Sequence, residues 1–291
     1  MSPLDLVNLT PLMELTSGRS EVAIGMVDGP VAVSHPDFAS ANIREVPGKS
    51  RAACSQMASV ACKHGTFVAS ILIARRGSPA PAICPGCTLL VRPIFAEPAG
   101  AGEQIPSTTP EELATAIIES IGAGAHVLNL SAALAQPSPN GQRELEGALD
   151  YAARRGVIVV AAAGNQGSIG STPITRHPWV IPVIACDREG RPIGQSNLGN
   201  SIGRRGLSAP GDQITGLGAE GQPVTLGGTS AAAPFVTGAI ALLWSAFPAA
   251  TATEVKSSVT RAPAARRGTV VPPLLDAWAA YGLMKDRFQR R

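Results

Sequence analysis

Short apolar runs alternate with helix-like stretches along most of the chain. Apolar runs of about four to eight residues are typical of strands that are buried on both faces of a sheet. The predicted strands are residues 21–27, 88–94, 127–130, 157–162 and 179–185, and the predicted helices are residues 64–75, 109–121, 141–155 and 231–244, with two further segments, 253–260 and 274–281, closing the chain. This alternation predicts an α/β fold, in which parallel βαβ units build a mostly parallel, twisted sheet with helices on both faces.

The residues around the predicted helices indicate where some of them begin and end. Thr109 can cap the second helix, Pro110 suits its first helical position, and Glu112 can complete a capping box. Gly156 ends the third helix. The fourth helix, residues 231–244, is apolar all round, which predicts a central helix buried in the core.

The sequence gives no sign of export or of membrane insertion. The first ten residues have no basic start and no long apolar stretch, so they do not resemble a signal peptide. The longest apolar stretch, residues 231–247, is interrupted by a proline and by small or polar residues, namely Pro234, Thr237, Gly238 and Ser245. A membrane span is therefore not expected. We expect a cytoplasmic protein with no membrane partner.

The composition favours one well-packed domain. Hydrophobic residues make up 45% of the chain and charged residues 15%, so a large core can form and disorder is not expected. The net charge of +3 is small for 291 residues and gives no reason to expect a nucleic-acid partner. We expect a single domain over residues 1–291, with residues 1–20 as an N-terminal extension and residues 283–291 as a basic tail.

The chain has five cysteines, and an odd number argues against a complete disulfide framework. Cys84 and Cys87 have the spacing of redox motifs. The intervening Pro-Gly is typical of a turn before the next strand, which favours two ordinary cysteines, and a local disulfide is the main alternative. A zinc site would need a second close pair of ligands, for which Cys54 and Cys62 are the one candidate.

Four polar residues stand where predicted strands end or predicted helices begin. Asp28 ends the first predicted strand, and Asn165 follows the fourth. His64 opens the first predicted helix, and Ser230 opens the apolar one. In open parallel sheets the functional site lies at the carboxyl ends of the strands. We therefore expect the four side chains to meet at that edge.

These four residue types are the set that nucleophilic catalysis by serine requires. The Ser230 hydroxyl is a poor nucleophile and needs a base such as His64, and a buried Asp28 carboxylate would orient and stabilise the imidazolium. The start of the helix at Ser230 and the Asn165 amide can donate to a developing oxyanion. Each residue alone could be a helix cap or a turn residue, but four together in this order favour catalysis.

In this order of aspartate, histidine and serine, with these neighbours, the chain resembles the subtilases. The resemblance extends over about residues 21–262. It implies a subtilisin-like three-layer fold and a serine endopeptidase. It also implies that Asp28, His64 and Ser230 form the catalytic triad and that Asn165 is the side-chain donor of the oxyanion hole.

Finer features resemble one branch of the subtilases, the cyanobactin-type proteases that mature ribosomal precursor peptides. The resemblance lies in residues 129–131, 190–197 and 209–211 and in departures from the usual subtilase pattern. It implies a peptide or precursor-peptide substrate. Three positions depart from the usual family residues without removing a catalytic atom: Gly29, Phe67 and Phe235.

The resemblance also implies where a peptide would bind. Ser131, Ala132 and Ala133 correspond to the edge segment that pairs with the substrate backbone. Ala162 and Gly164 correspond to one wall of the pocket for the side chain before the scissile bond.

No cofactor or metal is expected. Many secreted subtilases bind calcium in the loop that corresponds to residues 75–81. Here that loop holds two arginines and no carboxylate or amide side chain, which makes it a poor oxygen cage for Ca²⁺.

Two other functions fit the same fold: a peptide-binding pseudo-protease and a transpeptidase or macrocyclase. The cyclising relatives carry a helical insertion that shields the acyl-enzyme from water. The stretch between Asp28 and His64 is too short for such a cap, so the sequence favours hydrolysis.

Overall fold

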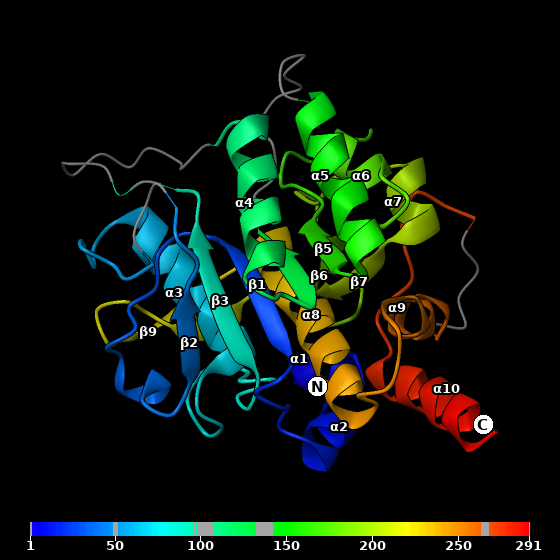
Figure 1. Cartoon of the computed structure of the whole chain (residues 1–291), viewed down its shortest axis with the longest axis horizontal. Coiled ribbons are helices and arrows are strands. Elements are labelled where there is room, and N and C mark those ends of the chain that lie inside the picture. The colour runs from blue at the N-terminus through cyan, green and yellow to red at the C-terminus, as the bar shows by residue number, and fades with distance from the viewer. Residues whose placement is uncertain are drawn as a thin grey trace.

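The computed structural model describes residues 2–48, 52–95, 97, 108–131, 142–262 and 268–290. A seven-stranded sheet, in which every neighbouring pair of strands is parallel, crosses the molecule in the order β2-β3-β1-β4-β5-β6-β7 (Figure 1). Its strands are β1 (Ala23–Asp28), β2 (Asn42–Glu45), β3 (Thr88–Pro93), β4 (Val127–Leu130), β5 (Ile158–Ala162), β6 (Val180–Cys186) and β7 (Leu207–Pro210). The predicted α/β fold with a mostly parallel sheet is confirmed.

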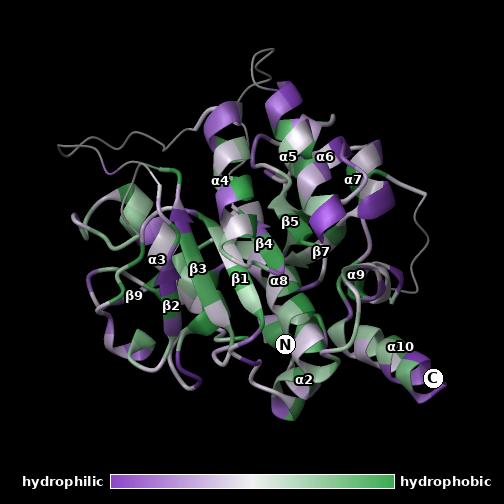
Figure 2. Ribbon diagram, in the orientation of Figure 1, coloured by the Kyte–Doolittle hydropathy of each residue, from purple (hydrophilic) through white to green (hydrophobic). Residues whose placement is uncertain are grey.

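Helices cover both faces of the sheet, which gives three layers. One face packs against α3 (Val60–Ile73) and α8 (Thr229–Ala246). Helix α8 in turn contacts α2 (Thr10–Leu15), α9 (Ala252–Arg261) and α10 (Ala277–Gln289). The opposite face packs against α4 (Pro110–Gly122), α5 (Gln142–Arg155), α6 (Pro173–Arg176) and α7 (Asn200–Arg205). In Figure 2, hydrophobic colour lies on strands such as β3 and β5, and hydrophilic colour lies at the outer ends of α4 and α5.

Successive residues of a strand face opposite layers. On β1, Met26 belongs to the apolar core beneath α3 and α8. On β4, Val127 belongs to the same core, whereas Leu128 belongs to the core on the other face. Asp28 and Asn129 follow Met26 and Val127 at a spacing of two, so they lie on the face that carries α3 and α8.

The apolar pattern missed several short strands. The edge strand β2 is half-exposed and carries asparagine, arginine and glutamate, so it has no apolar run. Strand β7 has four residues and ends in proline. The antiparallel pair β8 (Ile214–Leu217) and β9 (Pro223–Leu226) stands outside the main sheet, and β9 is largely exposed. Short strands without two buried faces leave little signal in the sequence.

Helix α8 is the central helix that its apolar sequence predicts. Among the described helices it is the one whose length and composition would allow it to cross a membrane, but 89% of that stretch is buried inside the molecule. It packs against β4, β5, β6 and β7. This is the setting of a core helix, with apolar side chains on every side.

Both ends of the chain pack against this core. The first residues form α1 (Pro3–Leu6) and α2, and Val7, Leu9 and Leu12 around them are fully buried. The Ala277 backbone N–H, at the start of α10, donates to the Val7 carbonyl at 3.0 Å. Helix α10 therefore closes over the N-terminal segment, and most of the basic C-terminal segment lies on this helix.

Candidate active site

Asp28, His64 and Ser230 form a continuous chain of hydrogen bonds. Asp28 is the last residue of β1 and is fully buried. Its Oδ1 lies 2.7 Å from His64 Nδ1, and His64 Nε2 lies 3.0 Å from Ser230 Oγ. The structure thus brings together three residues that are far apart in the sequence.

Helix α3, which carries His64, begins earlier than predicted. Its N-cap is Ser59, whose side chain accepts a hydrogen bond from the Cys62 N–H at 3.1 Å, so His64 lies in the second turn and does not open the helix. The prediction was wrong because the first turn, Val60 to Lys63, has no helix-start signal beyond the capping serine.

Two glycines allow the Asp28 loop to lie directly against α3. A Cβ atom on Gly29 would stand 2.1 Å from the Ala61 carbonyl oxygen, and one on Gly65 would stand 2.3 Å from the Pro30 carbonyl oxygen. Both distances are far below van der Waals contact, so a larger residue at either position would push the helix away. The close approach of this loop to α3 therefore requires glycine at position 29 in this chain.

Two opposing effects act on the charge of His64. Burial of the imidazole lowers its pKa, but the negative charge of Asp28 and the hydrogen bond to it raise the pKa by more, so the net pKa lies above the ordinary value. The ring is not sealed off, because 26% of the side chain is exposed. A neutral His64 has Nε2 free to accept the Ser230 proton.

Ser230 lies in the first turn of α8, as the sequence predicted. The N-cap is Gly228, whose φ of 114° is a conformation that glycine adopts readily. The first N–H groups of a helix have no partner within the helix. They carry the positive end of the helix dipole, which favours a negative charge beside Ser230.

Asn165 lies beside the start of α8, and hydrogen bonds between its loop and Thr229 hold it there. Its Oδ1 accepts a hydrogen bond from the Thr229 N–H at 2.8 Å, which leaves its Nδ2 free for another acceptor. The Thr229 hydroxyl accepts from the Gly164 N–H at 3.1 Å. These two bonds tie the loop after β5 to the start of α8, so the asparagine amide and Ser230 are fixed relative to each other.

Asn197 is a supporting residue that the sequence reasoning missed. Its Oδ1 accepts from the backbone N–H groups of Gln166 and Ser168, and its Nδ2 donates to the Ala163 carbonyl at 3.2 Å. A Cβ on Gly164 would stand 2.3 Å from this Nδ2. Asn197 therefore shapes the loop that presents Asn165. No local pattern marks an asparagine that acts from a separate loop.

Of the predicted substrate-binding residues, the structure places three. Ser131 directly follows β4 and is 8% exposed. Ala162 ends β5, and Gly164 is a buried residue with a φ of 106° in the loop that follows. Ala132 and Ala133 lie outside the described residues. The three that are described share the carboxyl edge of the sheet with Asp28.

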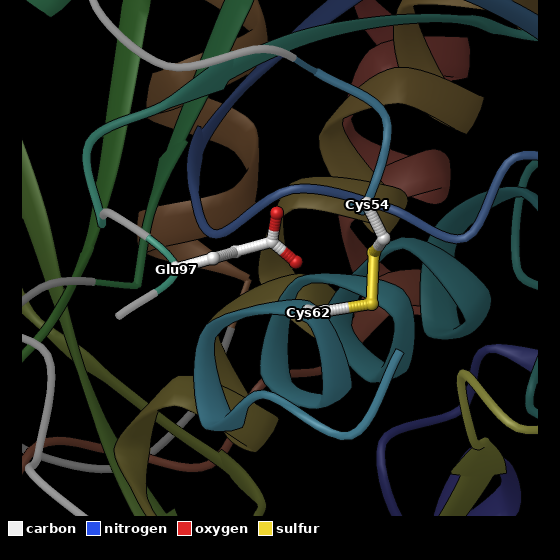
Figure 3. A group of neighbouring side chains, drawn as sticks. All are labelled: Cys54, Cys62 and Glu97. Atoms are coloured by element: carbon white, nitrogen blue, oxygen red, sulfur yellow. A yellow bond between two sulfur atoms is a disulfide. The ribbon is translucent and has the colours of Figure 1, made fainter. Parts of the chain in front are cut away.

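Cys54 and Cys62 form a disulfide at the start of α3 (Figure 3). The Glu97 carboxylate lies beside the two sulfurs. Because the sulfurs are bonded to each other, they cannot bind a metal as thiolates. Cys84 and Cys87 are free and buried, which confirms two ordinary cysteines and not the alternative of a local disulfide.

Glu97 is a second residue that the sequence did not reveal. Its carboxylate accepts hydrogen bonds from the backbone N–H groups of Ser55 and Gln56 and from the hydroxyls of Ser55 and Ser59. Partial burial raises its pKa, but these hydrogen bonds lower it by more, so the net pKa lies below the ordinary value. The carboxylate thus fastens the segment after β3 to the N-cap of the histidine helix.

The loop at residues 75–81 is held by arginine side chains. Arg76 donates to the carbonyl oxygens of Met13, Thr16 and Ile83, and Arg75 pairs with Asp37 at 2.7 Å. Both guanidinium groups are therefore engaged with oxygens of the protein, and they place positive charge at this loop. The expectation of no calcium site here stays a prediction, and these contacts agree with it.

A buried carboxylate, a histidine and a helix-start serine, joined at the carboxyl edge of a parallel sheet, define a subtilisin-like serine protease. The chain belongs to the Subtilase family (Peptidase S8), whose sequence pattern matches residues 19–272.

Individual relatives agree with this assignment. Subtilisin DY of Bacillus licheniformis is 29% identical over 246 residues, which cover 83% of each chain. Other curated relatives are longer, and the chain spans 54% of Mycosin-1 of Mycobacterium tuberculosis, with 30% identity.

Solved structures include two maturation proteases. A mutant of the protease domain of PatA superposes with a TM-score of 0.84 and 30% identity, covering 93% of this chain and 97% of that one. The prenylagaramide maturation protease PagA has a TM-score of 0.82 and 28% identity, covering 95% and 98%. The PatG macrocyclase domain, at 21% identity and a TM-score of 0.81, shares the fold.

Proposed function

We propose that the protein is an endopeptidase whose catalytic triad is Asp28, His64 and Ser230, with Asn165 in the oxyanion hole. The observation that carries this proposal is the pair of contacts at His64, 2.7 Å to Asp28 and 3.0 Å to Ser230. A buried carboxylate on one side of an imidazole and a hydroxyl on the other is the arrangement that activates a serine.

The residues then act in a fixed order. Ser230 Oγ bonds to the substrate carbonyl carbon while His64 Nε2 takes its proton. The Asn165 Nδ2 and the backbone N–H of Ser230, in the first turn of α8, donate to the oxyanion. His64 returns the proton to the leaving amine, the peptide C–N bond breaks, and an acyl-enzyme remains. Water repeats the sequence and releases the acid.

We further propose that the substrate is a precursor peptide, cut during maturation of a ribosomal product. Two structural relatives at 28–30% identity, over nearly their whole length, are PatA and the prenylagaramide maturation protease PagA. The peptide would pair with the segment that begins at Ser131. Ala162 and Gly164 would line the pocket for the side chain before the cut. The cytoplasmic location and the lack of nucleic-acid, membrane and cofactor partners remain predictions.

Hydrolysis is favoured over cyclisation by the segment before α3. Between Asp28 and the start of α3, the described residues form a short 3₁₀ turn, Pro36–Phe38, the edge strand β2 and the loop closed by the Cys54–Cys62 disulfide. Those described residues contain no α-helix that could cover the site. An acyl-enzyme that water can reach is hydrolysed.

Mass spectrometry of a cyanobactin-type precursor peptide after incubation with the enzyme tests both points. We expect linear fragments that together carry one added water for each cut, and no fragments with Ser230→Ala. A main product lighter by one water than its linear fragment would mean cyclisation and would overturn hydrolysis. Intact peptide beside an enzyme that cuts other peptides would overturn the proposed substrate class.

A further inference from the structure

One oxygen of the Asp28 carboxylate has no hydrogen-bond partner in the described part of the chain. Oδ1 accepts both from the Gly29 N–H, at 2.6 Å, and from His64. Oδ2 is fully buried and makes no bond with any described residue. A buried, charged oxygen without a donor is costly, so it is expected to have one when the enzyme works.

The residue after the aspartate cannot supply that donor. Gly29 has no side chain, and the Ala61 carbonyl oxygen leaves no room for one. A donor for Oδ2 must therefore come from a neighbouring strand or from a helix on the same face.

Ser131 is placed to provide it. Strands β1 and β4 are parallel, with Val27 opposite Leu130. One residue further along the same register, Asp28 comes opposite Ser131, and neighbouring strands lie about 5 Å apart. Opposite residues of a parallel pair point to the same face, so this register would set the serine hydroxyl on the same side of the sheet as the aspartate carboxylate, beneath α3 and α8.

The direction of the Ser131 hydroxyl is set by two buried residues behind it. The Thr237 hydroxyl, from α8, donates to Asn129 Oδ1 at 2.8 Å, and Asn129 Nδ2 donates to Ser131 Oγ at 2.7 Å. Asn129 and Thr237 are fully buried. Because Ser131 Oγ is the acceptor in this relay, its own proton is left to donate elsewhere.

We propose that Thr237 and Asn129 are positioning residues that aim the Ser131 hydroxyl at Asp28 Oδ2, directly or through one water molecule. Ser131 then supplies the donor that Gly29 cannot. The relay holds the carboxylate in the orientation that positions His64. This role of the serine side chain is separate from pairing with substrate, which uses the Ser131 backbone. The inference rests on the proposed triad.

The other charged groups near this carboxylate do not compete with the relay. His64 from α3 is the titratable side chain that contacts Asp28 among the described residues. Arg92, on the neighbouring strand β3, pairs with Glu112 and Glu119 of α4, on the opposite face of the sheet. A change in the relay should therefore reach the reaction through Asp28 and His64.

Labelling by a fluorophosphonate, followed from about pH 5 to about pH 9, tests the proposal, because the reaction needs an activated Ser230 and a neutral His64. Ser131→Ala should lower the plateau rate about tenfold, the size expected for one hydrogen bond to a charged group. The fall in labelling rate at low pH, the acid limb of the profile, should move to higher pH. The reason is that a carboxylate that has lost a donor holds the imidazole proton more strongly.

Thr237→Val keeps the shape of threonine and removes its hydroxyl donor. The side-chain amide of Asn129 can then flip, so that its oxygen accepts the Ser131 proton. Thr237→Val should reproduce both changes, and Thr237→Ser should restore wild-type behaviour. The double variant Ser131→Ala with Thr237→Val should be no slower than Ser131→Ala alone, because both act on one bond. Ser245→Ala, which removes another buried hydroxyl from α8, should leave the acid limb in place.

Three results would overturn the inference. One is a wild-type rate and acid limb in Ser131→Ala. Another is fully additive losses in the double variant, and the third is a Thr237→Val plateau that falls while the acid limb stays in place. If Thr237→Val does not fold, Ser131→Ala still decides whether the Ser131 hydroxyl acts on Asp28. A wild-type protein that does not react with the fluorophosphonate would instead contradict the proposed triad itself.

Discussion

At the scale of single residues, the site depends on how Asp28 and His64 share charge. The Asp28 side chain is fully buried, and His64 Nδ1 and the Gly29 N–H donate hydrogen bonds to its Oδ1. These two bonds hold the carboxylate against the imidazole. The imidazole is held between this carboxylate and Ser230, so in the proposed triad its protonation state decides whether the serine is activated.

The pH dependence of cleavage should show this directly. The net pKa of His64 lies above the ordinary value, with burial opposing and Asp28 favouring the protonated form. Protonated His64 cannot accept the Ser230 proton, so kcat/KM should fall as the pH drops through this raised pKa. The acid limb should lie above about 6.5, the value of an unperturbed histidine. A pH profile on any cleavable peptide measures it, and a limb at or below that value would contradict the assignment.

Asn165→Ala should lower kcat by about 10²–10³ with little change in KM, because the amide acts on the oxyanion and not on the bound substrate. The magnitude is carried over from the equivalent asparagine of subtilisin. Steady-state kinetics separates the two parameters. A large rise in KM with an unchanged kcat would show that Asn165 positions the substrate instead.

The residues of the site differ in how visible they are in the sequence. Asp28, Asn165 and Ser230 stand at the ends of strongly apolar elements, so their positions follow from the pattern around them. Glu97 and Asn197 support the site from separate loops. They act through long-range contacts with backbone N–H groups, for which the local sequence has no signal.

At the scale of elements, close packing of α3 against the end of β1 sets the distance between His64 and Asp28. Gly29 and Gly65 face the opposite backbone with no space for a side chain. The N-cap Ser59, the Glu97 carboxylate and the Cys54–Cys62 disulfide hold the start of the same helix.

Gly65→Ala should therefore separate α3 from the Asp28 loop. Its Cβ would stand 2.3 Å from the Pro30 carbonyl oxygen, and backbone cannot move aside as a side chain can. We expect the free energy of unfolding to fall by about 1–3 kcal/mol. The rate of peptide cleavage should fall as well, even under conditions where the variant is fully folded. Denaturant unfolding and peptide cleavage measure the two effects.

The matched control is Gly147→Ala in α5, where a Cβ would meet no atom within 4 Å. It should stabilise the protein by up to about 1 kcal/mol, because alanine favours the helix more than glycine does. Wild-type activity and stability in Gly65→Ala would show that the close approach is unimportant.

Elements with a strong apolar pattern could be predicted from the sequence, whereas elements held by tertiary contacts could not. Strands buried on both faces, such as β5 and β6, and the apolar helix α8 were predicted close to their bounds. Thr109 caps α4 as expected, with its hydroxyl accepting from the Glu112 N–H. The edge strand β2 and the start of α3 were missed, because tertiary contacts hold them and no apolar period marks them.

At the scale of the whole molecule, one central helix connects the reaction to the core. Helix α8 carries Ser230 in its first turn and packs against β4, β5, β6 and β7. Two turns later, Thr237 donates to Asn129 on β4. The two termini close over its far end. Ser230 is therefore fixed by the most buried helix among the described residues, which suits the proposed role of a nucleophile that must hold its geometry through two chemical steps.

The measurement that tests the central claim most directly is fluorophosphonate labelling, with the modified residue located by peptide mass spectrometry. We predict one labelled site, Ser230, and no label in Ser230→Ala or His64→Ala when circular dichroism shows that both variants are folded. Ser257→Ala, which changes a serine on α9, should label as the wild type does. Label on another serine, or an undiminished rate in Ser230→Ala, would contradict the account.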